Sequence, residues 1–385
     1  MPEPSKTWIK TPLIESSTLS KAAGCRIFLK LENLQPSGSF KSRGIGHYLE
    51  HHLRSLTQTA TQAQSQPPPP PHFYSSSGGN AGLACVHAAR TLDHLCTVVC
   101  PTSTKPLMLA KIRAAGAREV LVHGASWAEA DRWMREVVMV RAAAGDGERV
   151  NGKGGQRETP VYVPPFDHPV VWEGNSTLVG EVGAQFAEIG EEGGPDVLVC
   201  SVGGGGLLNG LIDGIERAGW DSTGTQVLAL ETQGAHSLAA SLADGKHVTL
   251  PGITSIATSL GATRVSERTY ELATTRPWIK SAVLSDAEAA MGCWRLADDE
   301  RMMVEPACGV NVALCYGGRL SKALGRTVGR DEKVVIVLCG GSNVTVEMLA
   351  EWKSGVGVLG DGVSEGEREV VASAATAAAT NGVEV

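Results

Sequence analysis

Short apolar runs alternate with amphipathic segments along most of this 385-residue chain. This alternation is typical of βαβ units, in which helices cover both faces of a mainly parallel sheet, and it predicts an α/β fold. Ligands of open α/β sheets bind beyond the carboxyl ends of the strands, so the loops after the strands are where we expect chemistry. The buried strands that we predict lie at residues 96–100, 119–123, 197–202, 226–231 and 334–339.

Length, charge and cysteine content narrow the class of protein. The length suggests two domains, or one large α/β unit with a subdomain. The formal net charge is -7 and there is no basic block, which makes nucleic acid and anionic membranes poor partners. The nine cysteines are scattered through apolar runs without a Cys-x-x-Cys pair, so we expect free thiols in a reducing compartment, by default the cytoplasm.

Three segments are expected to lie outside the core. Residues 57–72 combine Gln, Ser and Ala with five prolines and predict a solvated, disordered insertion, although a proline-rich ligand for an SH3-type partner is an alternative. Residues 144–159 are rich in Gly with mixed charge and form a second expected insertion. The tail at 354–385 is rich in Ala, Val, Gly and Glu and is expected to be disordered.

Lys41 lies at the end of the turn Pro36-Ser37-Gly38-Ser39-Phe40-Lys41 and opens a helix-like stretch. An amine beside Ser, Gly and Phe at a helix start can lose solvent, which lowers the pKa of such a group and makes it a nucleophile towards carbonyls. The alternative is an ordinary solvated surface lysine. The run by itself leaves both interpretations open.

Four consecutive glycines, Gly203, Gly204, Gly205 and Gly206, follow a predicted strand and precede Leu207. Without Cβ atoms, their backbone N–H groups can converge on an anion at the start of the next helix, and a phosphate is the natural guest. The run lacks the Gly-Lys-Ser or Gly-Lys-Thr ending of a Walker loop. The dinucleotide fingerprint also fails, but Glu231 ends the next predicted strand, where it would hold a ribose, so nicotinamide binding stays open as an alternative.

A second anion site is predicted at Ser75-Ser76-Ser77-Gly78-Gly79-Asn80-Ala81-Gly82, ahead of a helical stretch at 83–90. Amides at such a helix start, with Ser77 as the cap, suit a substrate carboxylate, and the Asn80 amide can donate to a phenolate-type oxygen. An ordinary capping turn is the alternative. In the run Val337-Leu338-Cys339-Gly340-Gly341, a predicted strand ends on a thiol that is either part of the core or a neutral partner for a cofactor ring.

An amine nucleophile, a phosphate loop and a second anion site together favour pyridoxal phosphate as the cofactor. On these residues the chain resembles the fold type II pyridoxal-phosphate enzymes, and within them the serine/threonine dehydratases. The resemblance covers nearly all of the chain from Thr11 to about Glu351, apart from the insertions. It is carried by Ser39-Phe40-Lys41-Ser42-Arg43-Gly44, Ser77-Gly78-Gly79-Asn80-Ala81-Gly82, Pro164-Pro165-Phe166-Asp167-His168-Pro169 with Trp172-Glu173-Gly174, Gly203-Gly204-Gly205-Gly206-Leu207, Glu231-Thr232-Gln233-Gly234-Ala235-His236-Ser237, Leu250-Pro251-Gly252-Ile253-Thr254-Ser255, Val304-Glu305-Pro306-Ala307-Cys308-Gly309 and Cys339-Gly340-Gly341-Ser342-Asn343.

The resemblance implies a fold, an activity and residue roles. It implies two open, twisted, mainly parallel sheets flanked by helices. They would form a large catalytic domain at 1–36 and 165–353 and a small substrate domain at 37–164. The implied activity is elimination of water and ammonia from L-serine to give pyruvate, with side activity on L-threonine giving 2-oxobutyrate. The alternatives are a threonine dehydratase, a non-catalytic binding protein of this fold or a nicotinamide-dependent oxidoreductase.

The implied cofactor contacts follow the motifs. Lys41 would hold the cofactor aldehyde covalently and then act as the base for the substrate α-proton. A neutral Cys339 would face the ring nitrogen and favour elimination over racemisation or transamination. The remaining cofactor contacts would be Phe40 against the ring, Asn80 on the ring hydroxyl oxygen, and Gly203, Gly204, Gly205, Gly206 and Leu207 at the phosphate. The substrate carboxylate would bind at Ser77, Gly78, Gly79 and Asn80.

The resemblance further implies a homodimer and a monovalent cation, K⁺ or Na⁺. The cation would be held by the Glu231 carboxylate with backbone oxygens of Ala235, Leu260 and Ala262. Gly78 departs from the alanine that is frequent in similar enzymes, which puts the shape of that loop in doubt. A regulatory C-terminal domain is not expected, and this points to a catabolic enzyme.

Overall fold

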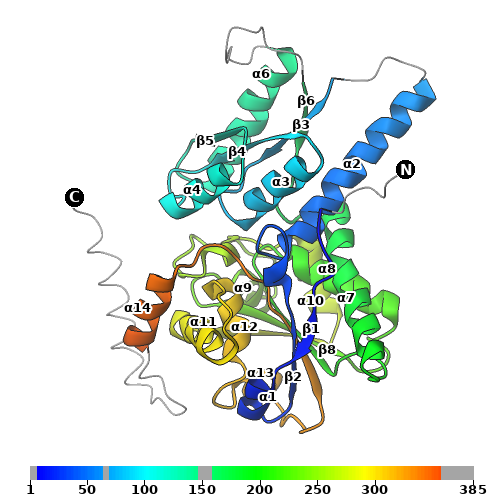
Figure 1. The fold of residues 1–385 in the computed structure, drawn as a ribbon. Coiled ribbons are helices and arrows are strands. Elements are labelled where there is room, and N and C mark those ends of the chain that lie inside the picture. Colours follow the sequence, from blue (N-terminus) through cyan, green and yellow to red (C-terminus); the bar gives the residue numbers. More distant parts are fainter. Residues whose placement is uncertain (1–6, 64–68, 146–157, 357–385) are drawn as a thin grey trace. The chain divides into compact units, whose positions relative to one another are not determined.

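The computed structural model describes residues 7–63, 69–145 and 158–356. Its contacts divide the chain into two compact units, which are described separately (Figure 1). The first unit comprises Met1–Lys10 and Leu34–Thr177, and the second comprises Thr11–Asn33 and Leu178–Val385. The division into a small domain at 37–164 and a large domain around it remains our proposal.

The first unit is built on a four-stranded parallel sheet in the order β5-β4-β3-β6. The strands are β3 (Pro71–Ser75), β4 (Leu95–Cys100), β5 (Glu119–Val122) and β6 (Thr159–Tyr162). The helices that surround them are α2 (Lys41–Ala63), α3 (Asn80–Thr91), α4 (Pro106–Ala114), α5 (Trp127–Trp133) and α6 (Met139–Ala144), with a π-helical turn at Met134–Val138.

Alternate strand residues bury against opposite layers of this unit, as the two-residue period of a strand requires. Phe73 and Val98 lie in one buried cluster with side chains of α2, α3 and α4. Their neighbours Tyr74 and Val99 lie in another, with side chains of α5 and the π-helical turn. Helices therefore cover both faces of the sheet, as the sequence pattern predicts.

The second unit contains a six-stranded sheet in the order β1-β2-β10-β7-β8-β9, in which only the β1–β2 pair is antiparallel. Its strands are β1 (Leu13–Glu15), β2 (Arg26–Lys30), β7 (Val197–Ser201), β8 (Gln226–Thr232), β9 (Ile279–Leu284) and β10 (Lys333–Val337). Two open, mainly parallel sheets with flanking helices confirm the predicted fold class.

Helices of the second unit pack on both its sheet and one another. Helix α12 contacts β7, β8 and β10, and α11 packs on α12. Helix α8 contacts β7, and α10 contacts α8 and β9. The helices are α1 (Ser17–Ala23), α8 (Gly206–Ala218), α9 (Ser237–Asp244), α10 (Glu267–Thr275), α11 (Asp286–Glu300), α12 (Pro306–Ala313), α13 (Arg319–Leu324) and α14 (Val346–Val356), while α7 (Pro169–Glu188) begins in the first unit and ends in the second.

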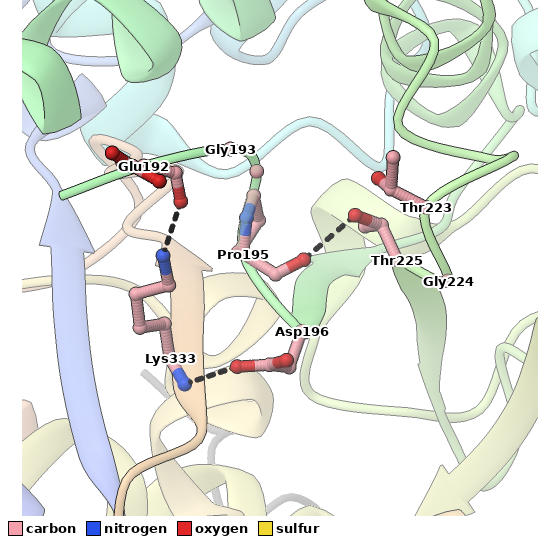
Figure 2. Close-up of a pocket in the computed structure, with 9 residues that line it drawn as sticks. Glu192, Gly193, Pro195, Asp196, Thr223, Gly224, Thr225 and Lys333 are labelled. Carbon is pink, nitrogen blue, oxygen red and sulfur yellow. Dashed lines mark hydrogen bonds between the residues drawn. The ribbon is translucent and has the colours of Figure 1, made fainter.

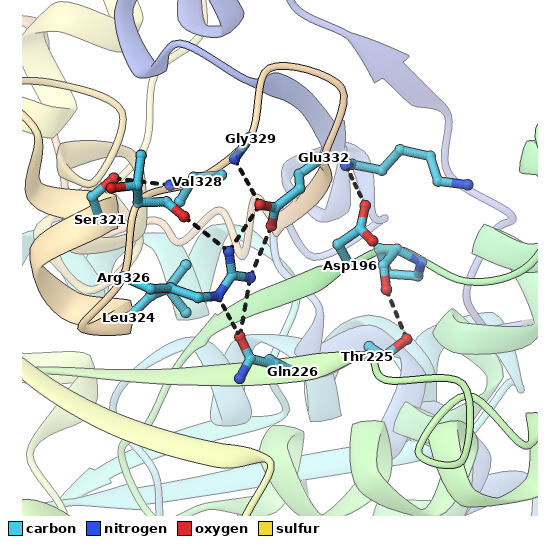
Figure 3. Close-up of polar contacts among 12 residues, drawn as sticks. Asp196, Thr225, Gln226, Ser321, Leu324, Arg326, Val328, Gly329 and Glu332 are labelled. Carbon is cyan, nitrogen blue, oxygen red and sulfur yellow. Dashed lines mark hydrogen bonds and ion pairs between the residues drawn. The ribbon is translucent and has the colours of Figure 1, made fainter.

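The amino ends of β7, β8 and β10 border a cavity of about 250 Å³ (Figure 2). Here the Lys333 amine donates to the carbonyl of Glu192, and the Thr225 hydroxyl donates to that of Pro195. Beside it, the Arg326 guanidinium binds both carboxylate oxygens of Glu332 at 2.8 Å (Figure 3). This edge is tied by polar contacts and lies opposite the carboxyl edge where the glycine loops begin.

Expectations for the peripheral segments are met only in part. Residues 57–63 continue α2 and residues 71–72 belong to β3, so the prediction of a disordered loop is wrong for both. The reason is that Gln, Thr and Ala do not break a helix, and no proline occurs between Lys41 and residue 67. Residues 64–68, 146–157 and 357–385, which hold part of the first insertion and most of the second insertion and of the tail, lie outside the described residues. Residues 354–356 of the tail belong to α14, so the expectation of disorder is wrong for them. Among the described residues, none of the helices is both long and apolar enough to cross a bilayer.

Candidate active site

Lys41 is the first residue of α2, as predicted, and its side chain is half-buried rather than fully solvated. Its amine donates a hydrogen bond to the carbonyl of Pro165 at 2.7 Å and lies 5.2 Å from the centroid of the Phe40 ring. The turn before it needs Gly38, whose φ of +76° is in the left-handed region. The local fold thus holds the amine against a ring and a carbonyl.

The helix that follows Lys41 packs closely on α7. A Cβ atom on Gly44 would lie 2.7 Å from the carbonyl oxygen of Val171, and one on Gly174 would lie 2.9 Å from the Cα atom of Gly44. Only glycine at both positions allows this approach. Because α7 follows directly after the Pro165 segment, the contact fixes the start of α2 near the carbonyl that its lysine binds.

The second predicted anion site lies in the loop between β3 and α3. Helix α3 begins at Asn80, and its N-cap is Gly79, so the prediction that Ser77 caps it is wrong. The Ser77 hydroxyl instead accepts the N–H of Gly79 at 3.3 Å, inside the loop. The loop also folds back on the helix, since a Cβ atom on Gly82 would overlap the carbonyl oxygen of Ser77.

The structure explains why residue 78 is a glycine in this chain. A Cβ atom there would lie 2.6 Å from both Cγ2 and Oγ1 of Thr104 and 2.9 Å from the Cβ atom of Cys100. Distances below 3 Å are not tolerated without movement of the neighbour. Gly78 and Thr104 therefore fit one another, which answers the doubt that the sequence raised about this loop.

The four-glycine loop connects β7 to α8 at the carboxyl edge of the larger sheet. Helix α8 begins at Gly206, as predicted, and its N-cap is Gly205 with φ of +92°. A Cβ atom on Gly205 would overlap Thr269 Oγ1 and lie 2.7 Å from the Thr269 Cβ atom. Since glycine has no side chain that could cap the helix, the amides at its start suit an external anion. Leu207 is buried in the first turn behind the loop.

Three buried polar residues that the sequence analysis did not single out brace this loop. Asn209 donates to Ser266 Oγ at 3.0 Å and accepts from Thr269 Oγ1 at 2.9 Å. Ser266 and Thr269 share a 2.7 Å hydrogen bond between their hydroxyl groups, and the Ser266 N–H donates to the carbonyl of Gly204. The link between α8 and the start of α10 fixes the loop, and nothing in the local sequence reveals it.

Cys339 follows β10 by two residues and is 6% exposed, at the same carboxyl edge as the glycine loop because β10 and β7 are parallel neighbours. Its Sγ atom lies 3.6 Å from Ser201 Oγ and 3.8 Å from Asn311 Nδ2. A hydrogen bond with the Cys308 thiol lowers the pKa of Cys339, burial opposes this shift, and Ser201 adds to it. All nine cysteines are free and buried, which confirms the expectation of unpaired thiols.

Glu231 is the second-to-last residue of β8, at the same edge, and is fully buried. Its two carboxylate oxygens accept the N–H groups of Leu238 and Ala239 in the first turn of α9, at 2.9 and 2.7 Å. Burial raises the pKa of Glu231 to about 7. Ala235 and Leu260 are buried as well, and Ala262 follows a short 3₁₀ turn at Thr258–Leu260 in the same unit.

The predicted site residues thus fall in two groups. The first unit holds Phe40, Lys41, Ser77, Gly78, Gly79 and Asn80, and the second holds Gly203, Gly204, Gly205, Gly206, Leu207, Glu231, Ala235, Leu260, Ala262 and Cys339. Within the second unit, the glycine loop follows β7, Glu231 lies near the end of β8 and Cys339 follows β10, so that the three share one edge of the sheet. The sequence analysis missed Asn311, which contacts Cys339. The signal that could have found it is one polar side chain in the otherwise apolar stretch 306–313.

Known proteins resemble this chain in sequence and in fold. The sequence is 40% identical over 352 residues to an L-serine dehydratase of Saccharomyces cerevisiae (strain AWRI1631), covering 91% of this chain and 98% of that protein. It is 40% identical over 348 residues to a catabolic L-serine/threonine dehydratase of Saccharomyces cerevisiae (strain ATCC 204508 / S288c), covering 89% of each. The crystal structure of a fungal L-serine ammonia-lyase from Rhizomucor miehei matches with a TM-score of 0.74 and 31% identity, over 91% of this chain and 99% of that one.

The family match covers most of the chain. Residues 5–340 match the family described as "Pyridoxal-phosphate dependent enzyme". The half-buried lysine at a helix start and the uncapped glycine loop are the two parts that such a cofactor needs from a protein. The chain belongs to the family of pyridoxal-phosphate dependent enzymes.

Proposed function

We propose that this protein is a lyase that converts L-serine to pyruvate and ammonia. The identity of 40% to an L-serine dehydratase over nine-tenths of the chain supports the substrate class. The observation that carries the choice of reaction is the buried thiol of Cys339 at the carboxyl edge of the sheet, where a carboxylate would favour other reactions of the same cofactor.

The residues of the predicted cofactor motifs would hold pyridoxal phosphate. Lys41 would hold its aldehyde, Phe40 would pack on its ring and Asn80 would bond the ring hydroxyl oxygen. Gly203, Gly204, Gly205, Gly206 and Leu207 would hold its phosphate, and Cys339 would face the ring nitrogen. The residues fit this group, because the left-handed Gly205 leaves the start of α8 without a side-chain cap. When bound, the cofactor supplies an electron sink for the bond that is broken at the substrate α-carbon.

The chain's own residues position the substrate and move the proton. The start of α3, with Ser77, Gly78, Gly79 and Asn80, would bind the α-carboxylate, since helix N-termini favour anions. Lys41, whose amine is held at 2.7 Å from the Pro165 carbonyl, would take the α-proton as the base. The neutral thiol of Cys339 would donate a hydrogen bond to the ring nitrogen and, because it keeps its proton, leave that nitrogen without a positive charge.

A monovalent cation, K⁺ or Na⁺, is part of this proposal. Glu231 with the carbonyls of Ala235, Leu260 and Ala262 offers the oxygen ligands that a hard cation prefers. The Ser237 hydroxyl, two residues after Ala235 in the chain, is buried and has no hydrogen-bond partner among the residues that the structure describes, which supports a polar guest here. A bound cation would hold Glu231 ionised against its burial.

Two broader properties complete the proposal. We expect a homodimer, as the resemblance to the dehydratases implies. We also place the protein in the cytoplasm, where nine free and buried thiols stay reduced.

The substrate choice between serine and threonine is tested by product analysis. Similarity to a catabolic L-serine/threonine dehydratase favours L-threonine as a second substrate. Purified protein loaded with pyridoxal phosphate is given each amino acid at equal concentration, and pyruvate and 2-oxobutyrate are measured. We expect both products and more pyruvate, with a difference of about 1–3 kcal/mol for one methyl group. Formation of neither product would refute the proposed activity, and a large excess of 2-oxobutyrate would reassign the enzyme as a threonine dehydratase.

A further inference from the structure

Helix α12 carries one polar side chain in an otherwise apolar stretch. Its residues Pro306–Ala313 read PACGVNVA, and Asn311 is 0% exposed within the second unit. Burying an amide is unfavourable unless its donors and acceptors are paired. A fully buried asparagine at this position therefore needs hydrogen-bond partners, which an apolar residue would not need.

The amide donors of Asn311 have two partners near the end of β10. Nδ2 lies 3.2 Å from the carbonyl oxygen of Val337 and 3.8 Å from Sγ of Cys339. The orientation of the amide follows from the chemistry, because a carbonyl oxygen only accepts and Nδ2 must face Val337. The second N–H is then directed to the sulfur. Oδ1 is buried without a hydrogen-bond partner among the described residues.

We propose that Asn311 is a positioning residue for Cys339: its amide N–H donates to the sulfur and makes the neutral thiol a stronger hydrogen-bond donor towards the cofactor ring. An N–H donor stabilises negative charge on sulfur, so a thiol that accepts it donates a stronger hydrogen bond to a neighbouring nitrogen while its own proton stays on the sulfur. This inference rests on the proposed function. It adds that Asn311 sets the strength of the hydrogen bond between the Cys339 thiol and the ring nitrogen.

Several other groups around the Cys339 sulfur also affect the pKa of its thiol. The Ser201 hydroxyl of β7 and the Cys308 thiol of α12 form hydrogen bonds with Cys339, and both lower the pKa of its thiol. Glu32 raises it through charge repulsion, and the Cys200 thiol also interacts with it. Glu305 accepts the N–H of Asn343 and faces the following turn. None of these groups replaces the amide donor that Asn311 supplies from the helix.

Replacing Asn311 by an apolar residue separates a role in stability from a role in the chemistry of Cys339. Removing one partner of a buried hydrogen bond is destabilising when the other partner is left unpaired, but the Val337 carbonyl keeps the N–H of Cys339 as a donor at 2.9 Å. Asn311→Leu removes both the N–H donors and the unpaired Oδ1. We therefore expect its resistance to urea to be unchanged or higher, while the chemistry of Cys339 changes.

The test titrates the Cys339 thiol directly. The thiolate ultraviolet absorbance of the full-length protein freed of cofactor is followed with pH, and the curve of the matching Cys339→Ser protein is subtracted. We expect the Cys339 midpoint in Asn311→Leu to be higher by about one pH unit, the size expected for one lost hydrogen bond to the charged form. Asn311→Ala serves as a second variant that should show the same shift if the leucine protein folds poorly.

A matched control comes from the same helix. Val310 is fully buried one residue away and lies on a different helix face from Cys308 and Asn311. We expect Val310→Ala to lower the urea midpoint and leave the Cys339 titration at the wild-type position. A wild-type Cys339 midpoint in both Asn311 variants would overturn the inference. Because the titration requires no turnover, it is independent of whether the protein acts on serine.

Discussion

The glycine at the N-cap of α8 offers the sharpest test of how the phosphate loop is built. Gly205 has φ of +92°, and a Cβ atom there would overlap Thr269 Oγ1 and lie 2.7 Å from Thr269 Cβ. Gly205→Ala would thus incur about 1–2 kcal/mol for a left-handed backbone with a side chain. It would incur a further 1–3 kcal/mol, roughly, for forcing Thr269 out of a packed site.

The assay compares Gly205→Ala with Gly219→Ala at the other end of the same helix. Gly219 has φ of +72°, but a Cβ atom there meets only Ser222 Oγ, at 4.0 Å. The control variant therefore carries the backbone strain without the overlap. Urea unfolding gives the free energy of unfolding of each variant, and equilibrium binding of pyridoxal phosphate gives the affinity.

We expect Gly205→Ala to lose about 2–5 kcal/mol of stability, which is the sum of the two contributions, and to bind the cofactor much more weakly. Gly219→Ala should lose about 1–2 kcal/mol and keep the wild-type affinity. Equal losses of stability in the two variants, together with unchanged affinity in Gly205→Ala, would refute the reasoning that packing against Thr269 shapes the loop.

Two further outcomes follow from the structure. Gly78→Ala should lose about 1–3 kcal/mol in urea unfolding because its Cβ atom meets Thr104, and the double variant Gly78→Ala/Thr104→Ala should recover most of it; no recovery would contradict the contact. Burial raises the pKa of Glu231 from 4.5 to about 7 in the folded protein. As pH rises between these values, the Glu231 carboxyl loses its proton in the unfolded state first. The free energy of unfolding therefore falls over this range, by about 3 kcal/mol. In Glu231→Gln this part of the pH dependence of the unfolding free energy should disappear, and adding K⁺ to the wild type should reduce it; an unchanged slope in Glu231→Gln would contradict the assignment.

Much of the fold follows from local sequence patterns. The five predicted strands are found within one or two residues, because fully buried strands read as continuous apolar runs. The strands that were not predicted are β1, β2, β3, β6 and β9. Two of them are weak signals, because β1 has three residues and β9 contains Lys280 and Ser281. The helical continuation of α2 to Ala63 was missed because composition alone suggested an insertion.

Some features of the site can likewise be predicted from short sequence motifs, whereas others depend on contacts between residues far apart in the chain. The helix starts at Lys41 and Gly206 follow from short motifs, since turn glycines and helix onset are local features. The brace of Asn209 by Thr269 and the contact of Asn311 with Cys339 join residues far apart in the chain, and only the fold reveals them. Ser77 was mistaken for the cap of α3 because its hydroxyl bonds within the loop instead.

The central claim is that Lys41 holds the cofactor and then removes the α-proton. Borohydride reduction of the loaded protein fixes the cofactor on the amine that holds it, and peptide mass spectrometry identifies the lysine. The account predicts the label on Lys41, and Lys41→Ala with excess pyridoxal phosphate should form no pyruvate from L-serine. A label on a different lysine, or pyruvate formation by Lys41→Ala at the wild-type rate, would contradict it.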